Sequence, residues 1–202
     1  MITKNFVSAN PENGDEGDSN ESFKVYKNII STQYDVFLSK EVSSDLNSYF
    51  DLLQLLDHDA KQGDVVHIKL ANYGGDLHSG IALAHAIKNC NAAVMVHAIS
   101  SCYSMAAILA MCGDGLIIYP GNYLMFHNYS GGEVGKAGEI ETSHRANKRS
   151  WEEALKYFCH PFLTSDEIKS IMDDKDKYIH FNEKGLKQRL KRHFVRMEMR
   201  DE

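Results

Sequence analysis

The chain has 202 residues, of which 43% are apolar and 25% are charged, and its formal net charge is −6 at pH 7. This length and composition are typical of one globular domain with tails. The negative net charge disfavours a protein that coats nucleic acid. No stretch of the sequence approaches the roughly 20 consecutive apolar residues that a membrane-spanning helix needs. The first residues contain no apolar segment of the kind found in secretory signals, so we expect a cytoplasmic protein.

The two ends of the chain differ from its middle in charge. Residues 8–22 carry acidic side chains and no basic one, so we expect a disordered acidic segment over residues 1–22. Residues 184–202 are rich in Lys and Arg and predict a basic amphipathic helix or tail. Its apolar residues recur at helical spacing: Leu186, Leu190, Phe194 and Met197. We interpret it as a packed or solvated helix and not as a membrane or nucleic-acid site.

The residues between the tails alternate between strand and helix patterns. In chain order we expect strand pieces within 25–38, a helix over 46–56, a strand over 65–70, a helix over 77–89, a strand over 93–98, a short helix over 104–111, strands over 116–119 and 124–126, and a long helix over 138–158. The first helix would begin at Ser43 or Ser44. Its apolar face would comprise Leu46, Tyr49, Phe50, Leu53 and Leu56. This alternation favours an α/β fold with a parallel sheet of βαβ units.

Side chains suited to acyl transfer follow several predicted strands. Gly74-Gly75 follows the strand over 65–70, Ser104 follows the strand over 93–98, and His127 follows the strand over 124–126. A serine is a weak nucleophile until an imidazole takes its proton, and a carboxylate orients that imidazole. Glycine turns and helix N-termini supply N–H donors for an oxyanion. Active groups of parallel sheets gather at these strand ends.

Four short segments, in register over residues 23–183, resemble motifs of the Clp protease proteolytic subunit (ClpP) family. Asn72-Tyr73-Gly74-Gly75-Asp76 resembles the family's Ser-Pro-Gly-Gly-Ser, Tyr103-Ser104-Met105-Ala106-Ala107 resembles Ala-Ser-Met-Gly-Ala, Met125-Phe126-His127-Asn128-Tyr129 resembles Met-Ile-His-Gln-Pro, and Asp174-Lys175-Asp176-Lys177-Tyr178 resembles Asp-Arg-Asp-x-Phe. The resemblance implies a ClpP/crotonase-like fold of repeated βαβ units, with the long helix as a protruding handle.

The resemblance also implies roles for single residues. Ser104 would be the nucleophile, His127 the general base and Asp176 the acid that orients it. Asp173 and Asp174 stay open as alternatives for the acid, because a slip of the alignment would select them.

Substrate contacts follow from the same resemblance. The backbone N–H groups of Gly75 and Met105 would form the oxyanion hole. An extended peptide would pair as an added strand between the segment after Gly75 and the one at Gly131-Gly132. No cofactor is implied. The cysteines form no CxxC pair and lack zinc-site spacing, so we expect buried thiols and no metal site.

These residues predict a serine endopeptidase that hydrolyses peptide bonds of unfolded polypeptides inside an oligomeric ring chamber, through an acyl-enzyme on Ser104. Family members stack heptameric rings, so we expect a homo-oligomer, as heptameric rings or a tetradecamer. The family also suggests an AAA+ unfoldase as a partner, although residues 8–22 do not resemble the family's axial loops. We expect no nucleic-acid or membrane partner.

Two departures from the family pattern motivate an alternative. Tyr103 stands beside the nucleophile where the family has alanine, and would narrow or occlude the pocket. Asp76 replaces a small residue in the glycine turn. The alternative is a catalytically weak, ring-forming scaffold or regulatory subunit. A crotonase-like acyl-CoA enzyme shares the fold but needs no Ser-His-Asp set, so we favour it less.

Overall fold

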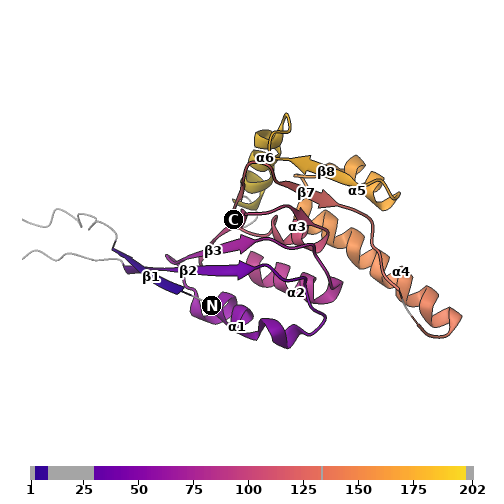
Figure 1. Ribbon diagram of the computed structural model, residues 1–202, viewed down its shortest axis with the longest axis horizontal. Helices are drawn as coiled ribbons and strands as arrows, with labels where there is room; N and C mark the ends of the chain where they lie inside the picture. The colour runs from indigo at the N-terminus through magenta and orange to yellow at the C-terminus, as the bar shows by residue number, and fades with distance from the viewer. Residues whose placement is uncertain (1–2, 9–29, 133, 199–202) are drawn as a thin grey trace, which may run out of the picture.

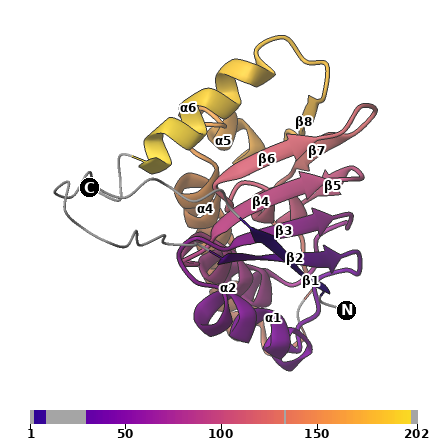
Figure 2. The same cartoon turned by 90° about the vertical axis from the view of Figure 1, so that its left-hand side faces the viewer.

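The structure is a computed structural model that describes residues 3–8, 30–132 and 134–198, except that the side chains of 3–8, 30 and 195–198 are not considered. Its larger sheet has the strand order β1-β2-β3-β4-β6. The bounds are Thr3–Ser8 for β1, Ile30–Leu38 for β2, Val65–Leu70 for β3, Ala93–Ala98 for β4 and Gly115–Ile118 for β6. Strands β2, β3, β4 and β6 are parallel, and β1 pairs antiparallel with β2. Figure 2 shows these strands side by side.

A smaller sheet carries part of the candidate site. It has the order β5-β7-β8, with β5 at Cys102–Tyr103, β7 at Tyr123–Phe126 and β8 at Lys177–His180. Strand β5 runs parallel to β7, and β8 runs antiparallel to it. The α/β fold with parallel strands is confirmed and is consistent with the ClpP/crotonase-like fold.

Helices surround both sheets. They are the 3₁₀ turn η1 (Leu46–Tyr49), α1 (Phe50–Gln54), the π-helical turn η2 (Leu55–Asp59), α2 (Leu77–Lys88), α3 (Met105–Leu109), α4 (Ala137–Ala154), the π-helical turn η3 (Leu155–Cys159), α5 (Ser165–Met172) and α6 (Leu186–Glu198). Figure 1 shows α1 and α2 beneath the larger sheet and α6 on the opposite side of the molecule. The hydrophobic core lies between the helices and the sheets, and every residue of α3 is buried in it. Across the described ranges, no helix combines the length and apolar character needed to cross a membrane.

Helix α4 protrudes from the body. Its buried residues, Trp151 and Ala154, lie in its last turns, while most of its first turns are exposed. Figure 1 shows the N-terminal end of α4 projecting away from both sheets. Ion pairs of opposite charge four residues apart, such as Arg145–Glu141 at 2.8 Å, support an exposed helix of this kind.

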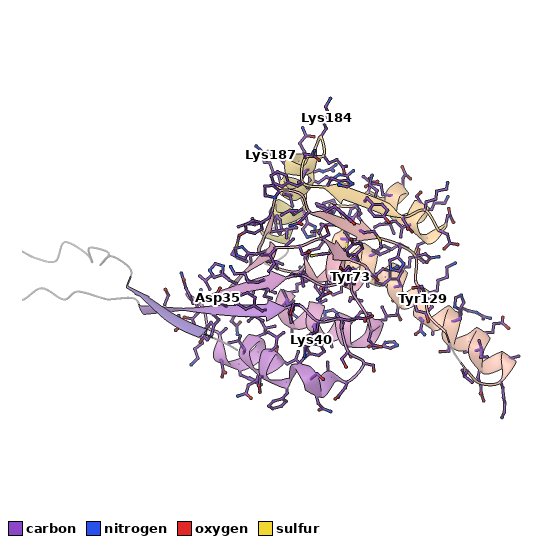
Figure 3. The ribbon with its side chains drawn as sticks, in the orientation of Figure 1. Asp35, Lys40, Tyr73, Tyr129, Lys184 and Lys187 are labelled. Carbon is purple, nitrogen blue, oxygen red and sulfur yellow. The ribbon has the colours of Figure 1, made fainter. Side chains whose placement is uncertain are left out.

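Helix α6 is anchored to the body partly through the carboxylate of Glu167. Glu167 of α5 accepts two hydrogen bonds from the Arg189 guanidinium, both at 2.8 Å, and lies 3.0 Å from Lys177 Nζ. Arg189 also donates to the Phe162 carbonyl at 2.9 Å. The helix lies where the basic amphipathic pattern predicts one, with Lys184 and Lys187 pointing outward (Figure 3).

The structure corrects the first predicted helix. Of the predicted apolar face, Leu56 is fully buried and Tyr49 and Leu53 pack against the core, but Leu46 and Phe50 are 40% and 63% exposed. Leu52 and Leu55, which lie outside the predicted face, are also buried. The reason is that η1 and η2 do not keep the α-helical period, so the buried side matches the predicted face only in part. The cap is neither Ser43 nor Ser44 but Asp45, whose carboxylate accepts from the Asn47 N–H at 3.1 Å.

The structure also differs at the N-terminus and in the last third of the chain. Thr3–Ser8 forms strand β1, although a disordered segment is predicted over 1–22, because its backbone pairs with β2. The acidic residues 9–22 lie outside the described residues. Three further elements, β5, α5 and β8, are not among those that the sequence patterns predict.

Candidate active site

Two of the three predicted catalytic residues, Ser104 and His127, line one cavity of about 560 Å³, and Asp176 does not. Ser104, His127 and Gly75 all line it, and each follows the carboxyl end of a strand, namely β5, β7 and β3. Gly131 also lines the cavity. The remaining lining residues come from the loop after β2, the loop before α2 and the first turn of α2, the loop after β7, and α4: Glu41, Val42, Ser44, Tyr73, Asp76, Leu77, His78, Tyr129, Ser130, Asn147 and Trp151.

Ser104 occupies a strained turn between β5 and α3. Its backbone has φ 55° and ψ −125°, a conformation that non-glycine residues rarely adopt and that costs about 1–3 kcal/mol. Hydrogen bonds hold the turn in place: the Ser104 N–H donates to the Met125 carbonyl at 2.8 Å, and the Ser104 carbonyl accepts from the Ala107 N–H at 3.0 Å. The sharp turn presents the side chain to the cavity at the N-terminus of α3.

The glycine turn packs directly against the nucleophile segment. A Cβ at Gly74 would lie 2.8 Å from Ser104 Cβ and 2.9 Å from the Met105 nitrogen, so only glycine fits there. Gly75 has φ +129°, and a Cβ there would overlap the backbone of Val42. Within the described ranges, no hydrogen bond is donated by the Gly75 or Met105 N–H. Both donors therefore suit the predicted oxyanion hole.

The backbone of His127 is held in place by a contact with helix α4. Its carbonyl accepts a hydrogen bond from Trp151 Nε1 at 3.0 Å, and the two ring centroids are 6.2 Å apart. Trp151 is 3% exposed, so the contact ties the loop after β7 to the buried base of α4. The imidazole itself is half-buried and borders the cavity.

The position of the acid is less constrained by the structure. Asp173, Asp174 and Asp176 are all exposed and lie in the turn between α5 and β8. Asp174 has φ +62° and accepts a hydrogen bond from Asn128 Nδ2 at 2.6 Å. Of the residues that the structure describes, none makes a hydrogen bond that joins the side chains of Ser104, His127 and Asp176. The assignment of Asp176 stays a prediction.

Tyr103 does not border the cavity. Its ring packs against Tyr73 with centroids 5.0 Å apart, and its hydroxyl forms a short hydrogen bond with the Tyr123 hydroxyl. The sequence leaves open whether Tyr103 narrows or occludes the pocket, and in the structure its side chain is not among those that line the cavity. Tyr73, which is 75% exposed, borders the cavity in its place.

The site is also supported by residues to which the sequence motifs assign no role. Asn72 is buried, and its Oδ1 accepts from the Gly74 N–H at 2.9 Å, which shapes the glycine turn. An asparagine two residues before a turn glycine is a recognisable signal for this bond. Asp76 caps α2 by accepting from the Ser79 N–H at 2.8 Å. No local sequence signal indicates that Trp151 supports His127.

Three of the four cysteine thiols are buried and unsuited to catalysis or metal binding, whereas Cys90, for which the sequence also predicts burial, is half-buried. Cys102, Cys112 and Cys159 are buried, and burial raises the pKa of Cys102 to about 12, against a weaker opposing hydrogen bond from Asn72. These thiols are therefore protonated at neutral pH and are poor nucleophiles. In the described part of the chain, no three His, Cys, Asp or Glu side chains gather as metal ligands would.

A parallel sheet, a strained serine at a helix N-terminus and a facing glycine turn define an α/β protein of the ClpP/crotonase class. A comparison with protein-family models matches residues 17–184 to the Clp protease family. The chain belongs to this family. The resemblance seen in the four sequence motifs is confirmed.

Proposed function

We propose that this chain is a serine endopeptidase that hydrolyses peptide bonds of unfolded polypeptides. The convergence of Ser104, His127 and Gly75 on one cavity is the observation that carries the proposal. These groups come from three different strand ends. The stability of the core does not require them to border a common cavity, whereas acyl-transfer catalysis does. Membership of the Clp protease family supports the same reaction class.

The proposed reaction has two steps. Ser104 Oγ attacks the peptide carbonyl while His127 takes its proton, and the N–H groups of Gly75 and Met105 donate to the resulting oxyanion. The C–N bond then breaks, and His127 returns the proton to the leaving amine. A water molecule, deprotonated by His127, hydrolyses the ester and restores Ser104. Asp176 would keep the imidazole in one tautomer.

The substrate would bind as an extended strand. Gly131 borders the cavity, and a Cβ there would lie 2.5 Å from Tyr129 Oη, so a side chain at this position would crowd the site. A Cβ at Gly132 would meet no atom of the described residues within 4 Å, which leaves the neighbouring edge open. Backbone pairing at Gly131-Gly132 would give affinity without strict sequence demand.

Assembly into rings is part of the proposal. The exposed first turns of α4 offer a long surface through which copies of the chain would join. We propose heptameric rings, stacked as a tetradecamer, with the cavities facing an internal chamber. An AAA+ unfoldase is the proposed source of unfolded polypeptide.

Hydrolysis of an unstructured fluorogenic polypeptide tests the proposal. We expect Ser104→Ala and His127→Ala each to lower kcat/KM by at least about 10³-fold. Ser44→Ala and His78→Ala are the matched controls, because these residues border the same cavity and have no proposed role. Full activity in Ser104→Ala, or equal losses in His127→Ala and His78→Ala, would refute the proposal.

The acid is tested by a second comparison. Asp176→Asn, Asp174→Asn and Asp173→Asn remove one charge each without changing side-chain volume. We expect the largest fall in kcat for Asp176→Asn, because a neutral partner no longer stabilises the imidazolium. A larger fall for Asp174→Asn would transfer the role to Asp174.

One observation favours the alternative of a catalytically weak ring subunit. Asp176 is exposed and, among the described residues, makes no hydrogen bond to His127. Such a subunit would assemble into rings of the same size but show no hydrolysis in the wild type. Sedimentation of the wild type beside the hydrolysis assay separates this outcome from a failure to assemble.

A further inference from the structure

A continuous row of tyrosines runs from the loop after β3 across the smaller sheet, next to Ser104. The row, here called the aromatic strip, consists of Tyr73, Tyr103, Tyr123 and Tyr178. Successive ring centroids lie 5.0 Å, 5.4 Å and 5.6 Å apart. His180 extends the strip, with its ring centroid 5.0 Å from that of Tyr123. These spacings are those of packed aromatic pairs.

The strip lies on the side of the smaller sheet that faces away from the core. Along β7, Tyr123 is half-buried and Leu124 fully buried, and along β8 Tyr178 is 44% exposed while Ile179 is fully buried. Alternation of this kind places the tyrosines on one face and the aliphatic residues on the other. The aromatic strip is therefore a surface that the described part of the chain leaves uncovered.

The strip is continuous with the candidate active site. Tyr73 borders the cavity and also packs on Tyr103, the residue directly before Ser104. Tyr73 is 75% exposed, whereas tyrosine side chains in folded proteins are on average of intermediate burial. In Figure 3, Tyr73 and Tyr129, both of which border the cavity, lie on the α4 side of the larger sheet.

The Tyr103 hydroxyl, in the middle of the strip, stays protonated at neutral pH. The hydrogen bond between the hydroxyls of Tyr103 and Tyr123, with a smaller contribution from burial, raises the pKa of Tyr103 to about 12. Lys177, the lysine of β8, is paired with Glu167 at 3.0 Å. The strip thus offers ring faces and hydroxyls, with the His180 imidazole beside Tyr123, and such a surface suits the stacking of aromatic side chains.

We propose that the aromatic strip is a substrate-recognition surface, on which Tyr73 and Tyr178 select polypeptides that carry aromatic side chains beside the scissile bond. The inference rests on the proposed peptidase function and names the substrate class for the same site. Tyrosine rings lose little conformational freedom on binding and supply both stacking area and hydrogen bonds. A peptide strand that enters the cavity past Tyr73 would lay alternate side chains along the strip.

Binding to the inactive Ser104→Ala protein tests this inference without requiring hydrolysis. Two labelled, unstructured peptides are compared by fluorescence anisotropy; they differ only in having Phe or Ala at alternate positions. We expect the Phe peptide to bind about five-fold more tightly for each ring engaged. Tyr73→Ala and Tyr178→Ala, each made in the Ser104→Ala protein, should reduce that preference. Tyr119→Ala should leave it unchanged, because Tyr119 is 42% exposed but belongs to the larger sheet.

The possible results separate the inference from the proposed function. Equal affinity for the two peptides, or a preference that survives both Tyr73→Ala and Tyr178→Ala, would overturn the inference. A change of oligomer size in Tyr178→Ala would also overturn it, since the strip would then be an interface between copies of the chain. Selective binding with no hydrolysis by the wild type would support the strip while refuting the peptidase.

Discussion

Asn128 forms hydrogen bonds that connect the end of strand β7, next to His127, to the turn that contains Asp173, Asp174 and Asp176. Its Nδ2 donates to Asp174 Oδ1 at 2.6 Å and to the Met172 carbonyl at 3.1 Å, while its Oδ1 accepts from the Tyr129 N–H at 2.8 Å. Because Asn128 directly follows His127, these bonds set the separation between the proposed general base and the acidic turn. The two bonding partners, Met172 and Asp174, lie 44 and 46 residues after Asn128 in the sequence.

Asn128→Ala should therefore slow the reaction through position alone. We expect kcat to fall about ten-fold with KM nearly unchanged, since a small displacement of a catalytic group is costly while the binding cavity stays intact. Steady-state kinetics on a fluorogenic peptide measure both constants. Asn182→Ala, at an exposed asparagine, is the control. A rise in KM at constant kcat would mean that Asn128 contacts substrate instead.

The strained backbone of Ser104 predicts an unusual order of stabilities. At φ 55° glycine relieves strain that alanine keeps, so Ser104→Gly should have a free energy of unfolding about 1 kcal/mol higher than Ser104→Ala. Urea denaturation of both variants checks this order. Ser170, inside helix α5, supplies the control, where glycine should be less stable than alanine by about 1 kcal/mol. The same order at both positions would contradict the role of strain.

Asp76 both caps α2 and places a carboxylate in the cavity beside Gly75. A negative charge there opposes the developing oxyanion, so Asp76→Asn should raise kcat about two- to five-fold. Asparagine caps helices as well as aspartate, so stability should change by less than about 0.5 kcal/mol. Asp76→Ala should lose about 1 kcal/mol with the cap. Slower acylation in Asp76→Asn would show that the carboxylate assists the reaction.

Glu167 predicts how stability depends on pH. Burial alone would raise its pKa, but hydrogen bonds from Arg189, the Thr164 N–H and Lys177 outweigh burial and lower the pKa to about 2. The unfolded carboxyl titrates near its ordinary pKa of about 4.3. A depressed folded pKa stabilises the protein above the unfolded value, and this contribution disappears as pH falls toward 2.

Glu167→Gln isolates this contribution. The difference in free energy of unfolding between wild type and Glu167→Gln should be largest above about pH 4.5 and should shrink as the pH falls toward 2. Denaturant titrations across that range measure it. Glu141→Gln is the control, because Glu141 is 74% exposed in its pair with Arg145 and surface pairs contribute little. A difference that stays constant with pH would contradict the proposed role of the ion pairs.

Strands flanked by clear local signals are predictable from the sequence. Val65–Leu70 and Ala93–Ala98 have the predicted bounds, because runs of β-branched and apolar residues between turn residues specify a buried strand locally. The glycine turn, Ser104 and His127 follow such strands, so their common location at strand ends could also be expected.

Features that depend on contacts between distant segments are not predictable in this way. The direction of the Tyr103 ring depends on Tyr73 and Tyr123, which belong to other parts of the chain. The exposure of Phe50 follows from 3₁₀ and π-helical turns that interrupt the periodicity on which its predicted burial depends. Support of His127 by Trp151 likewise arises only when α4 packs against the loop after β7.

The most direct measurement is the intact mass of the wild-type chain and of Ser104→Ala after incubation with a fluorophosphonate. In this reaction an Oγ–P bond forms, fluoride leaves, and His127 takes the serine proton. If Ser104 is an activated nucleophile, the wild type will carry one adduct per chain and Ser104→Ala will carry none. An adduct that persists in Ser104→Ala, or no adduct on assembled wild-type rings, would contradict the central claim.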